Sequence, residues 1–430
     1  MINFFRLLDS NRHIVFCPMN FVADTYVGCP HGCWYCYAPS FSARGGFEDS
    51  FPKFRNFRRR FNCDRDFEKI EAALEGGMVK GTCSRKQEEF VAKALEHRHP
   101  LRIGSVSEPF GVPLEKQYRD TYRVLEMLIQ HDYPFVVCTK SPLVATAAYV
   151  NLLKSAKKVG VQISLISLDD NLLQSIESSG SGLTPSARSR YTTLKKLSNE
   201  GIFTTCRIQP VIPQVTEGGI KDLIFALAEA GVNHVIAEFL WFPLVHGKKM
   251  SARLKLELDN YGRNNGSVGE FLKKHNNDLY TFYRSFGDYR VSDGRLFYSK
   301  SQISRSMTKI SAIVSEANNE FNSNMSFGSG NEETTFLNST NNCCGVDRID
   351  GFAERSPCTV HTMFRIAKEK GRVTLNEMKE SYNPYSERIV ELWNKEEKQG
   401  YFIENRVFKI KRKVTDNRVE YVYDETLFPA

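Results

Sequence analysis

Short apolar segments alternate with amphipathic segments along much of the N-terminal half of the chain. Each apolar segment is rich in Val, Ile, Phe or Thr and is apolar at both alternating positions, as strands covered on both faces should be. Six segments show this pattern: VADTYVG, LRIGSVS, PFVVCTKS, VQISLIS, IFTTCRIQPVI and HVIAEFLWF. The segments between them fit helices, and the one reading PSARSRYTTLKKLSNEG ends at Gly201, a residue suited to a C-cap. Repeated βα units predict an α/β fold with a parallel sheet, open or barrel-shaped, and six units would form a partial (β/α)6 barrel of the TIM type.

The pattern changes near residue 245. Residues 245–340 are polar, so we expect irregular helices such as VGEFLKKHNNDLYTFYRSF, and loops over SEANNEFNSNMSFGSGNEETTFLNSTNN. From about residue 358 three helices are predicted, TVHTMFRIAKEKG, TLNEMKESY and YSERIVELWNKEEKQG, followed by strands in YFIENRVFKI and VEYVYDE. This order is that of a winged helix, although a small helical cap on the barrel fits as well. We therefore expect a barrel over 1–244, a polar region over 245–340 and a cysteine-containing α+β extension over 341–430.

Composition and charge narrow the class of protein. The chain has 430 residues, of which 41% are hydrophobic and 25% charged, which is ordinary for a globular protein. No apolar run approaches the roughly 20 residues of a membrane span, and the first residues lack the apolar core of a signal peptide, so we expect a cytoplasmic protein. The net charge of +8 permits a polyanionic partner without requiring one. Eleven cysteines without an export signal favour metal or redox chemistry over disulfides.

Three of these cysteines, Cys29, Cys33 and Cys36, lie within the segment VGCPHGCWYCYAPS. Structural zinc sites have four ligands, usually in two separated pairs, and this triplet does not fit that spacing. A [4Fe–4S] cluster has four irons that each need an external ligand. Three cysteines on one loop can hold three irons and leave the fourth open. The triplet therefore predicts a [4Fe–4S] cluster with one position free for a substrate or cofactor.

The CxxxCxxC spacing resembles that of the radical S-adenosylmethionine (radical SAM) superfamily. The resemblance implies that the open iron binds the amino and carboxylate groups of SAM. Electron transfer, from a reductase of the flavodoxin or ferredoxin type, then gives a 5′-deoxyadenosyl radical that abstracts hydrogen. The family fold is a partial (β/α)6 barrel with the cluster loop after the first strand, and here VADTYVG directly precedes Cys29. Tyr35 occupies the position before the third cysteine, where an aromatic residue is usual.

A closer resemblance is to the spore photoproduct lyase-like branch, whose members are often called DNA repair photolyases. It covers roughly residues 13–243 and is carried by GCPHGCWYCYA, SVSEPFGVPLE, VVCTKSPL, ISLISLDD, SIESSGSGLTPSARSRYTTLKKLSNEGI and RIQPVIP. The resemblance implies a large substrate, DNA or RNA, that is repaired or modified. Two alternatives remain: a radical SAM enzyme acting on a peptide or small metabolite, and a non-catalytic iron–sulfur module that binds or senses.

The same resemblance implies positions for the cofactor contacts. Tyr35 and Tyr37 are expected near adenine or the cluster, and Ser107 and Lys140 at the ribose or carboxylate of SAM. Ser164 is a similar polar contact. Active sites of β/α barrels lie at the carboxyl ends of the strands, where Ser107, Lys140 and Ser164 occur. A lysine among apolar residues also needs an anion, which the SAM carboxylate would supply to Lys140. The two serines would equally fit simple hydrogen bonding to the backbone.

Four further residues follow from the resemblance. Glu177 and Arg190 are expected either to bind the methionine moiety of SAM or to form an ion pair with each other. Gln209 and Pro210 close the fifth strand and are expected on the adenine side.

One position departs from the spore photoproduct lyase pattern. That enzyme has a cysteine two positions before the residue equivalent to Ser107, and this cysteine returns a hydrogen atom to the product. Here the position is Ser105. A hydroxyl O–H bond is too strong to donate a hydrogen atom readily to a carbon radical, whereas a thiol S–H bond is weak. Either the chemistry differs or another thiol replaces it, and the candidates are Cys138, Cys17 and Cys206, although free cysteines are also common core residues.

A second cysteine group occurs in NNCCGVDRIDGFAERSPCTVHTMF. It contains Cys343, Cys344, Cys358 and His361. Three thiolates and an imidazole could hold a second metal, as a zinc site or an auxiliary cluster. Alternatively, Cys343 and Cys344 could enter the barrel and donate hydrogen, or remain an inert reduced pair in a loop.

Two basic stretches suggest a polyanionic partner. The segment FPKFRNFRRRFNCDR interleaves phenylalanines with Lys53, Arg55, Arg58, Arg59 and Arg60. Cations contact phosphates and aromatic rings stack on unpaired bases, so this segment could bind nucleic acid. The tail segment RVFKIKRK could form a basic wing. A solvated charged face is the alternative for both.

Overall fold

The computed structural model describes residues 2–8, 17–31, 33, 35–38, 56–77, 79–177, 184–212, 215–243, 289–292, 295–356, 358–380, 393–394, 409–415 and 418–427. An eight-stranded sheet with the order β1-β2-β5-β6-β7-β8-β9-β13 forms its centre. β1 (Phe5–Leu7) is antiparallel to β2 (Phe21–Ala23). The other pairs are parallel and involve β5 (Leu101–Ile103), β6 (Phe135–Thr139), β7 (Val159–Ser164), β8 (Phe203–Val211), β9 (His234–Phe239) and β13 (Ser326–Ser329).

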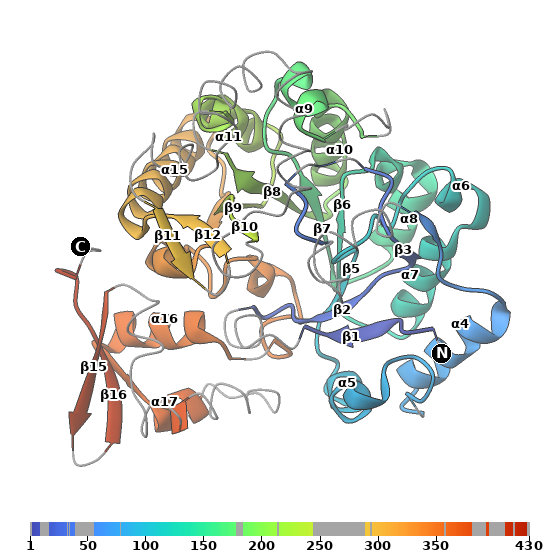
Figure 1. Ribbon diagram of the computed structural model, residues 1–430, viewed down its shortest axis with the longest axis horizontal. Coiled ribbons are helices and arrows are strands. Elements are labelled where there is room, and N and C mark those ends of the chain that lie inside the picture. Colours follow the sequence, from blue (N-terminus) through green and yellow to red (C-terminus); the bar gives the residue numbers. More distant parts are fainter. Residues whose placement is uncertain are drawn as a thin grey trace.

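The six predicted parallel strands are β2 and β5 to β9, so the prediction of an α/β partial barrel is confirmed. β1 and β13 are the two edges of the sheet, which therefore stays open between them. Helices cover its outer face (Figure 1). They are α4 (Asp64–Leu74), α5 (Glu88–Glu96), α6 (Leu114–Tyr118), α7 (Asp120–Gln130), α8 (Ala147–Lys154), α9 (Asp170–Glu177), α10 (Ala187–Asn199), α11 (Ile220–Glu229) and α15 (Lys300–Phe321).

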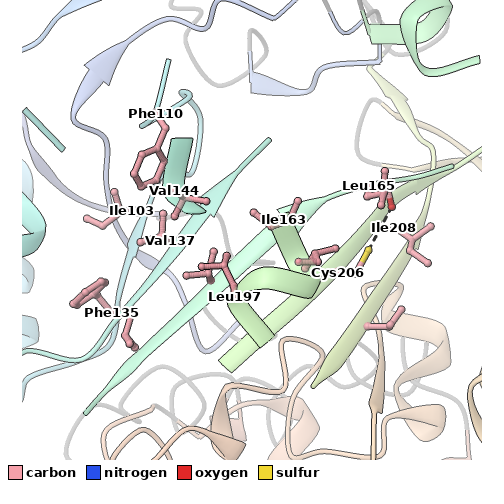
Figure 2. Packing of buried hydrophobic residues seen from close by; sticks show 14 of the residues in the cluster. Ile103, Phe110, Phe135, Val137, Val144, Ile163, Leu165, Leu197, Cys206 and Ile208 are labelled. Atoms are coloured by element: carbon pink, nitrogen blue, oxygen red, sulfur yellow. Dashed lines mark hydrogen bonds between the residues drawn. The ribbon is translucent and has the colours of Figure 1, made fainter. Parts of the chain in front are cut away.

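The two faces of each strand have different surroundings, because side chains alternate along a strand. On β6, Phe135 and Val137 point to the helices and join the main hydrophobic core, which is shown in part in Figure 2. Val136 and Cys138 belong to the opposite, inner face. Helix α7 contributes Val124, Leu125 and Leu128 to the main core, an i, i+1, i+4 pattern typical of an amphipathic helix lying on a sheet.

A short segment of the second cysteine group fills part of the inner face. Cys344, Val346, Ile349 and Phe352 are buried together with residues of the strands and the N-terminal segment, namely Met19, Val136 and Ile236. This segment was expected to start a separate extension at residue 341. Its packing inside the barrel joins it to the barrel core instead.

The polar region predicted as irregular contains regular structure in its second part. α15 is a helix of 22 residues, and β13 follows it as the last strand of the central sheet. The loop prediction over residues 315–329 is therefore wrong for these elements. Ile303, Met307, Ile310 and Val314 are buried along one side of α15 at helical spacing. The many Ser and Asn residues on its other side conceal this pattern. The helix predicted over 268–286 lies outside the described residues.

The C-terminal part is α+β, as predicted. It consists of α16 (Val360–Lys370), β14 (Arg372–Thr374), α17 (Leu375–Glu380), β15 (Ile410–Thr415) and β16 (Arg418–Tyr423). The strands form an antiparallel sheet in the order β14-β16-β15 beside α16, with a hydrophobic core of its own. This order is the one that a winged helix requires. The third predicted helix, over 385–400, lies outside the described residues apart from 393–394.

Smaller pieces complete the described structure. β3 (Tyr26–Val27) pairs with β4 (Arg58–Arg59), and β10 (Phe242–Pro243), β12 (Arg295–Tyr298) and β11 (Tyr289–Ser292) form a three-stranded sheet. In the described part of the chain, no helix combines the length and the apolar character needed to cross a membrane.

Two glycines with positive φ test how tightly the end of β5 is fixed. Gly104 (φ +82°) and Gly201 (φ +76°) both have a backbone conformation that favours glycine. A Cβ added at Gly104 would clash with the Cys138 carbonyl oxygen, whereas one added at Gly201 would meet nothing within 4 Å. We expect Gly201→Ala to lower the free energy of unfolding by about 1 kcal/mol. Gly104→Ala should lower it by about 3 kcal/mol, because overpacking adds to the backbone cost. Urea unfolding measures both, and equal losses would contradict the described contact.

Candidate functional site

The three clustered cysteines lie on the loop that follows β2 and β3, at the carboxyl-terminal edge of the sheet. Cys29, Cys33 and Cys36 all line one cavity of about 320 Å³. Cys33 is buried, and the Cys36 backbone N–H donates to the Cys33 carbonyl at 3.2 Å. The cavity is also lined by the predicted residues Tyr35, Tyr37, Ser107, Cys138, Lys140, Ser164, Gln209, Pro210, Cys343 and Cys344. Of the predicted cofactor contacts, only Glu177 and Arg190 are not among its lining residues.

Glu177 and Arg190 lie behind the cavity wall in a buried ionic network. One carboxylate oxygen of Glu177 accepts from Lys140 Nζ at 2.7 Å and from the Tyr35 hydroxyl. Its other oxygen accepts from Arg190, which also donates to the Ser164 carbonyl at 3.0 Å. The network therefore contains the ion pair that was one of the two expectations for Glu177 and Arg190. The anion that Lys140 requires comes from Glu177 of the chain itself.

Charge and burial oppose each other at Glu177. Burial alone would raise the pKa of this carboxyl, but Lys140 and Arg190 lower it to about 2. Glu177 and Arg190 side chains are completely buried, and that of Lys140 is 13% exposed. A carboxylate between two cations in such surroundings stays ionised at all physiological pH values. It fixes the position of Lys140 and Tyr35 at the cavity wall.

Two other buried carboxylates organise the loops around the cavity. Asp24 follows β2 and accepts hydrogen bonds from the Ser107 hydroxyl at 3.1 Å and from the Ser105 hydroxyl at 3.4 Å, and it pairs with Arg6. The Ser107 backbone N–H also donates to Asp24, at 3.2 Å. Ser107 therefore owes its position to Asp24, which sequence reasoning missed. The sequence feature that could have indicated this role is the position of Asp24, an acidic residue, inside the apolar segment VADTYVG.

Glu108 is the second of these carboxylates. It accepts from the Lys140 backbone N–H at 2.9 Å and from the Thr139 hydroxyl, and it pairs with His31 of the cysteine loop at 3.1 Å. Burial would raise the pKa of Glu108, but hydrogen bonding to His31 and Thr139 and to the Lys140 backbone lowers it overall. Glu108 therefore joins the cysteine loop to the end of β6. Sequence reasoning missed this residue as well.

The three thiols of the loop line one cavity, and a [4Fe–4S] cluster takes one thiolate for each iron, so this donor set suits three of its four irons. The described part of the chain contains no group of three His, Cys, Asp or Glu side chains that could hold a single metal ion. The cavity also contains an unsatisfied acceptor suited to SAM: Gln209 Oε1 is buried without a hydrogen-bond partner among the described residues, while its Nε2 donates to Glu238 at 2.8 Å.

Four thiols from distant parts of the sequence lie at the inner face of the sheet. Cys17, Cys138, Cys343 and Cys344 belong to one cluster of side chains and all line the cavity. The sulfurs of Cys343 and Cys344 are 3.9 Å apart. This arrangement fits the expectation that the Cys343–Cys344 pair enters the barrel.

Two of the other cysteine predictions are corrected. Cys206 is on the outer face of β8, buried in the main core with its thiol directed at the Leu165 carbonyl (Figure 2), so it does not face the cavity. Cys358 is buried in the separate core of the C-terminal part, whereas Cys344 is in the barrel. His361 contacts Asn338 through Nδ1 at 3.0 Å. It lines the same cavity as Cys343 and Cys344. Cys358 is therefore separated from the rest of the group proposed as a second metal site, and the described residues contain no group of three such side chains that could hold a metal ion.

The basic stretch after the cluster loop has mainly structural contacts where it is described. Arg59 forms two hydrogen bonds with Asp120, at 2.7 and 2.8 Å, and Arg60 donates to backbone carbonyls of residues 2, 3 and 26. Phe61 is 1% exposed. Arg59 and Arg60 are therefore held by contacts within the protein, whereas Arg58 is exposed and contacts the Asn56 carbonyl at 3.4 Å. Nucleic-acid binding by this stretch stays a prediction. Lys53 and Arg55 lie outside the described residues.

The chain is similar in sequence to several known proteins. Residues 24–227 match the model of the radical SAM superfamily. An uncharacterised protein of Mycobacterium tuberculosis is 24% identical over 297 residues, covering 64% of this chain and 77% of the relative. One from Methanocaldococcus jannaschii is 24% identical over 220 residues, covering 51% and 70%. A radical SAM Nα-GlyT isomerase of Pseudomonas phage M6 is 26% identical over 147 residues, covering 33% and 29%.

Solved structures with a similar arrangement were also found. A spore photoproduct lyase with bound AdoMet and dinucleoside spore photoproduct shares 13% identity with a TM-score of 0.48, and the match covers 76% of this chain and 78% of that one. SuiB of Streptococcus suis bound to its precursor peptide SuiA shares 14% identity with a TM-score of 0.35, covering 59% and 46%.

Removing the charge of Glu177 should destabilise the fold in a pH-dependent way. The unfolded carboxyl takes up a proton near its ordinary pKa of 4.5, whereas folded Glu177 stays ionised down to about 2. Its contribution to stability is therefore complete above about pH 4.5 and is lost as the pH falls toward about 2. At neutral pH we expect Glu177→Gln to lower the free energy of unfolding by about 3 kcal/mol, because two buried cations lose their anion.

Urea unfolding followed by circular dichroism at several pH values measures this effect. Glu200→Gln is the matched control, since Glu200 forms only an exposed pair with Lys154 and should change stability little. Equal stability of the two variants at neutral pH would show that the Glu177 network does not hold the site together.

Proposed function

We propose that this chain is a radical SAM enzyme that abstracts hydrogen from a nucleic acid in order to repair or modify it, and the match of residues 24–227 to the radical SAM model supports this. One observation carries the proposal: three thiols of a single loop share one cavity with polar strand-end residues and with a separate group of thiols. The first set is suited to holding a cluster and SAM, and the second to returning hydrogen. A binding module without turnover would not need the second set.

Several residues of the cavity are suited to holding the cofactors. Cys29, Cys33 and Cys36 would each bind one iron of a [4Fe–4S] cluster, which supplies, when bound with SAM and reduced, the 5′-deoxyadenosyl radical. Lys140, held by Glu177 and Tyr35, presents a cation to the cavity for a carboxylate or ribose oxygen. Gln209 presents its free amide oxygen to a donor such as an adenine amino group.

The thiols at the inner face would complete the reaction. A hydrogen atom passes from a thiol of the Cys343–Cys344 pair or Cys138 to the substrate carbon radical, so that a C–H bond forms as the S–H bond breaks. The sulfur radical left behind takes up one electron and one proton, and a flavodoxin- or ferredoxin-type reductase supplies the electron. Reduced thiols and a reduced cluster both require a reducing compartment, which favours the cytoplasm.

A basic face on the C-terminal sheet supports a nucleic-acid substrate. Arg372, Lys411, Lys413 and Arg418 surround the single carboxylate of Glu420 on the face of β14-β16-β15 that alternates with the buried Val419 and Tyr421. Glu420 pairs with Arg372 and Lys413, both at 3.3 Å. Lys411 and Arg418 are exposed and form no ion pair with described residues. Such a face on a hairpin beside helix α16 is suited to contacting phosphates.

Release of 5′-deoxyadenosine tests the chemistry. Anaerobically reconstituted protein with SAM and dithionite should release it, and Cys33→Ala should reduce release to background because one iron loses its ligand. Cys63→Ala is the matched control, since Cys63 is exposed and lies outside the cavity. Liquid chromatography of the products measures the release. Turnover that survives in Cys33→Ala, or fails in the wild type with every nucleic acid and peptide offered, would contradict the proposed enzyme.

Salt-dependent binding to labelled oligonucleotides tests the substrate class. Replacing Lys411 and Arg418 together by Gln should weaken binding and lower the slope of log affinity against log salt by about 2, one for each lost phosphate contact. Fluorescence anisotropy measures both quantities. Lys93→Gln, at an exposed position on α5, should leave them unchanged. An unchanged slope in the double variant, or binding only of peptides, would favour the peptide alternative.

A further inference from the structure

Arg102 is a buried cation that has no oxygen partner among the described residues. It lies in the middle of β5, is 9% exposed and lines the cavity beside the thiols. Its NH2 group contacts the sulfurs of Cys344 at 3.5 Å and Cys17 at 3.6 Å. Its Nε is buried and has no hydrogen-bond partner among the described residues. Sulfur is a weak acceptor, so these contacts satisfy the guanidinium poorly.

The thiols do not neutralise this charge. A hydrogen bond from Cys17 would lower the pKa of Cys344, but a hydrogen bond to Cys343 and burial raise it overall to about 12. The thiol is therefore neutral near pH 7. A buried charge without a counterion is costly, and proteins normally pair it or use it to bind a ligand of opposite charge.

Arg207 supplies a second cation to the same cavity. It lies on the inner face of β8, half-buried, and its NH1 donates to Gln162 Oε1 at 2.6 Å. Gln162 also accepts from the Cys138 thiol at 3.4 Å, so Arg207 is close to the thiols as well. Within the described residues, neither arginine forms an ion pair. Three carboxylates line the cavity, namely Glu108, Glu238 and Glu332. Glu108 pairs with His31, and Glu238 accepts from Gln209.

We propose that Arg102 and Arg207 form a phosphate-binding subsite inside the barrel, which anchors a phosphate group of the substrate next to the thiols. The statement that the bound phosphate belongs to the substrate rests on the proposed function, whereas the phosphate site itself does not. A phosphate group presents oxygens in several directions and can bridge guanidinium groups on two different strands, whereas the two oxygens of a carboxylate lie in one plane and suit a single guanidinium fork. Anchoring at this point brings neighbouring carbon atoms of the substrate to Cys343 and Cys344.

Calorimetric titration of the full chain with inorganic phosphate tests the subsite, without SAM or reductant. We expect measurable binding to the wild type and at least about tenfold weaker binding for Arg102→Gln and for Arg207→Gln. Arg102→Lys should retain binding within a few-fold. Arg188→Gln is the matched control, because Arg188 is exposed on α10 and does not line the cavity.

Two further readouts separate the subsite from other roles of the arginines. Without phosphate, Arg102→Gln should melt at the same temperature as the wild type or higher, since it removes an unpaired buried charge. Saturating SAM should leave phosphate affinity unchanged. Full competition by SAM would overturn the proposal, because the arginines would then hold the SAM carboxylate.

Three other results would also overturn it: tighter binding of acetate than of phosphate, no binding of phosphate by the wild type, or wild-type affinity in both glutamine variants. If the protein bound phosphate through the two arginines but released no 5′-deoxyadenosine, the result would contradict the proposed enzyme and would still support the subsite.

Discussion

Glu177 connects three parts of the site that are far apart in the sequence. Its carboxylate accepts hydrogen bonds from Tyr35 of the cysteine loop, Lys140 at the end of β6 and Arg190 of α10. Arg190 also donates to the Ser164 carbonyl at the end of β7. Without this anion, Lys140 and Arg190 would repel each other, and the loop would lose one of its links to the sheet, another being the Glu108–His31 pair. The positions of the cysteines relative to the strand ends therefore depend on this ion network together with Glu108.

The cavity is lined by two chemically different sets of side chains. One set is the cysteine triplet with Lys140, Ser164 and Gln209, which are suited to a cluster and to SAM. The other set is Cys343 and Cys344 with Arg102 and Arg207, which form no ion pair within the described residues. The two sets meet on the sheet, because Arg207 of β8 is the register partner of Ser164 of β7. Cys343 and Cys344 reach the cavity because the segment around Cys344 packs into the barrel, against inner residues of β6 and β9.

Local sequence patterns predicted much of this structure, but they did not predict contacts between residues that are far apart in the sequence. The six parallel strands and the strand-end placement of Lys140 and Ser164 follow from apolar segments and βα order, which are properties of short windows. Helices α16 and α17 and strand β16 follow in the same way, whereas β14 was not predicted and β15 begins where the predicted strand ends. In contrast, Arg102 contacts Cys17 and Cys344, which are 85 and 242 positions away in the sequence, and no local pattern indicates these contacts. Helix α15 was missed because its buried residues are spaced through a polar segment.

The account rests on three thiolates that each bind a different iron. Electron paramagnetic resonance of the anaerobically reconstituted, reduced protein tests this most directly, together with iron and sulfide analysis. The account predicts iron and sulfide in equal amounts and a reduced-cluster signal that changes when SAM is added, because SAM binds the iron without a cysteine ligand. Zinc in the loop, or a cluster signal that SAM does not alter, would contradict it.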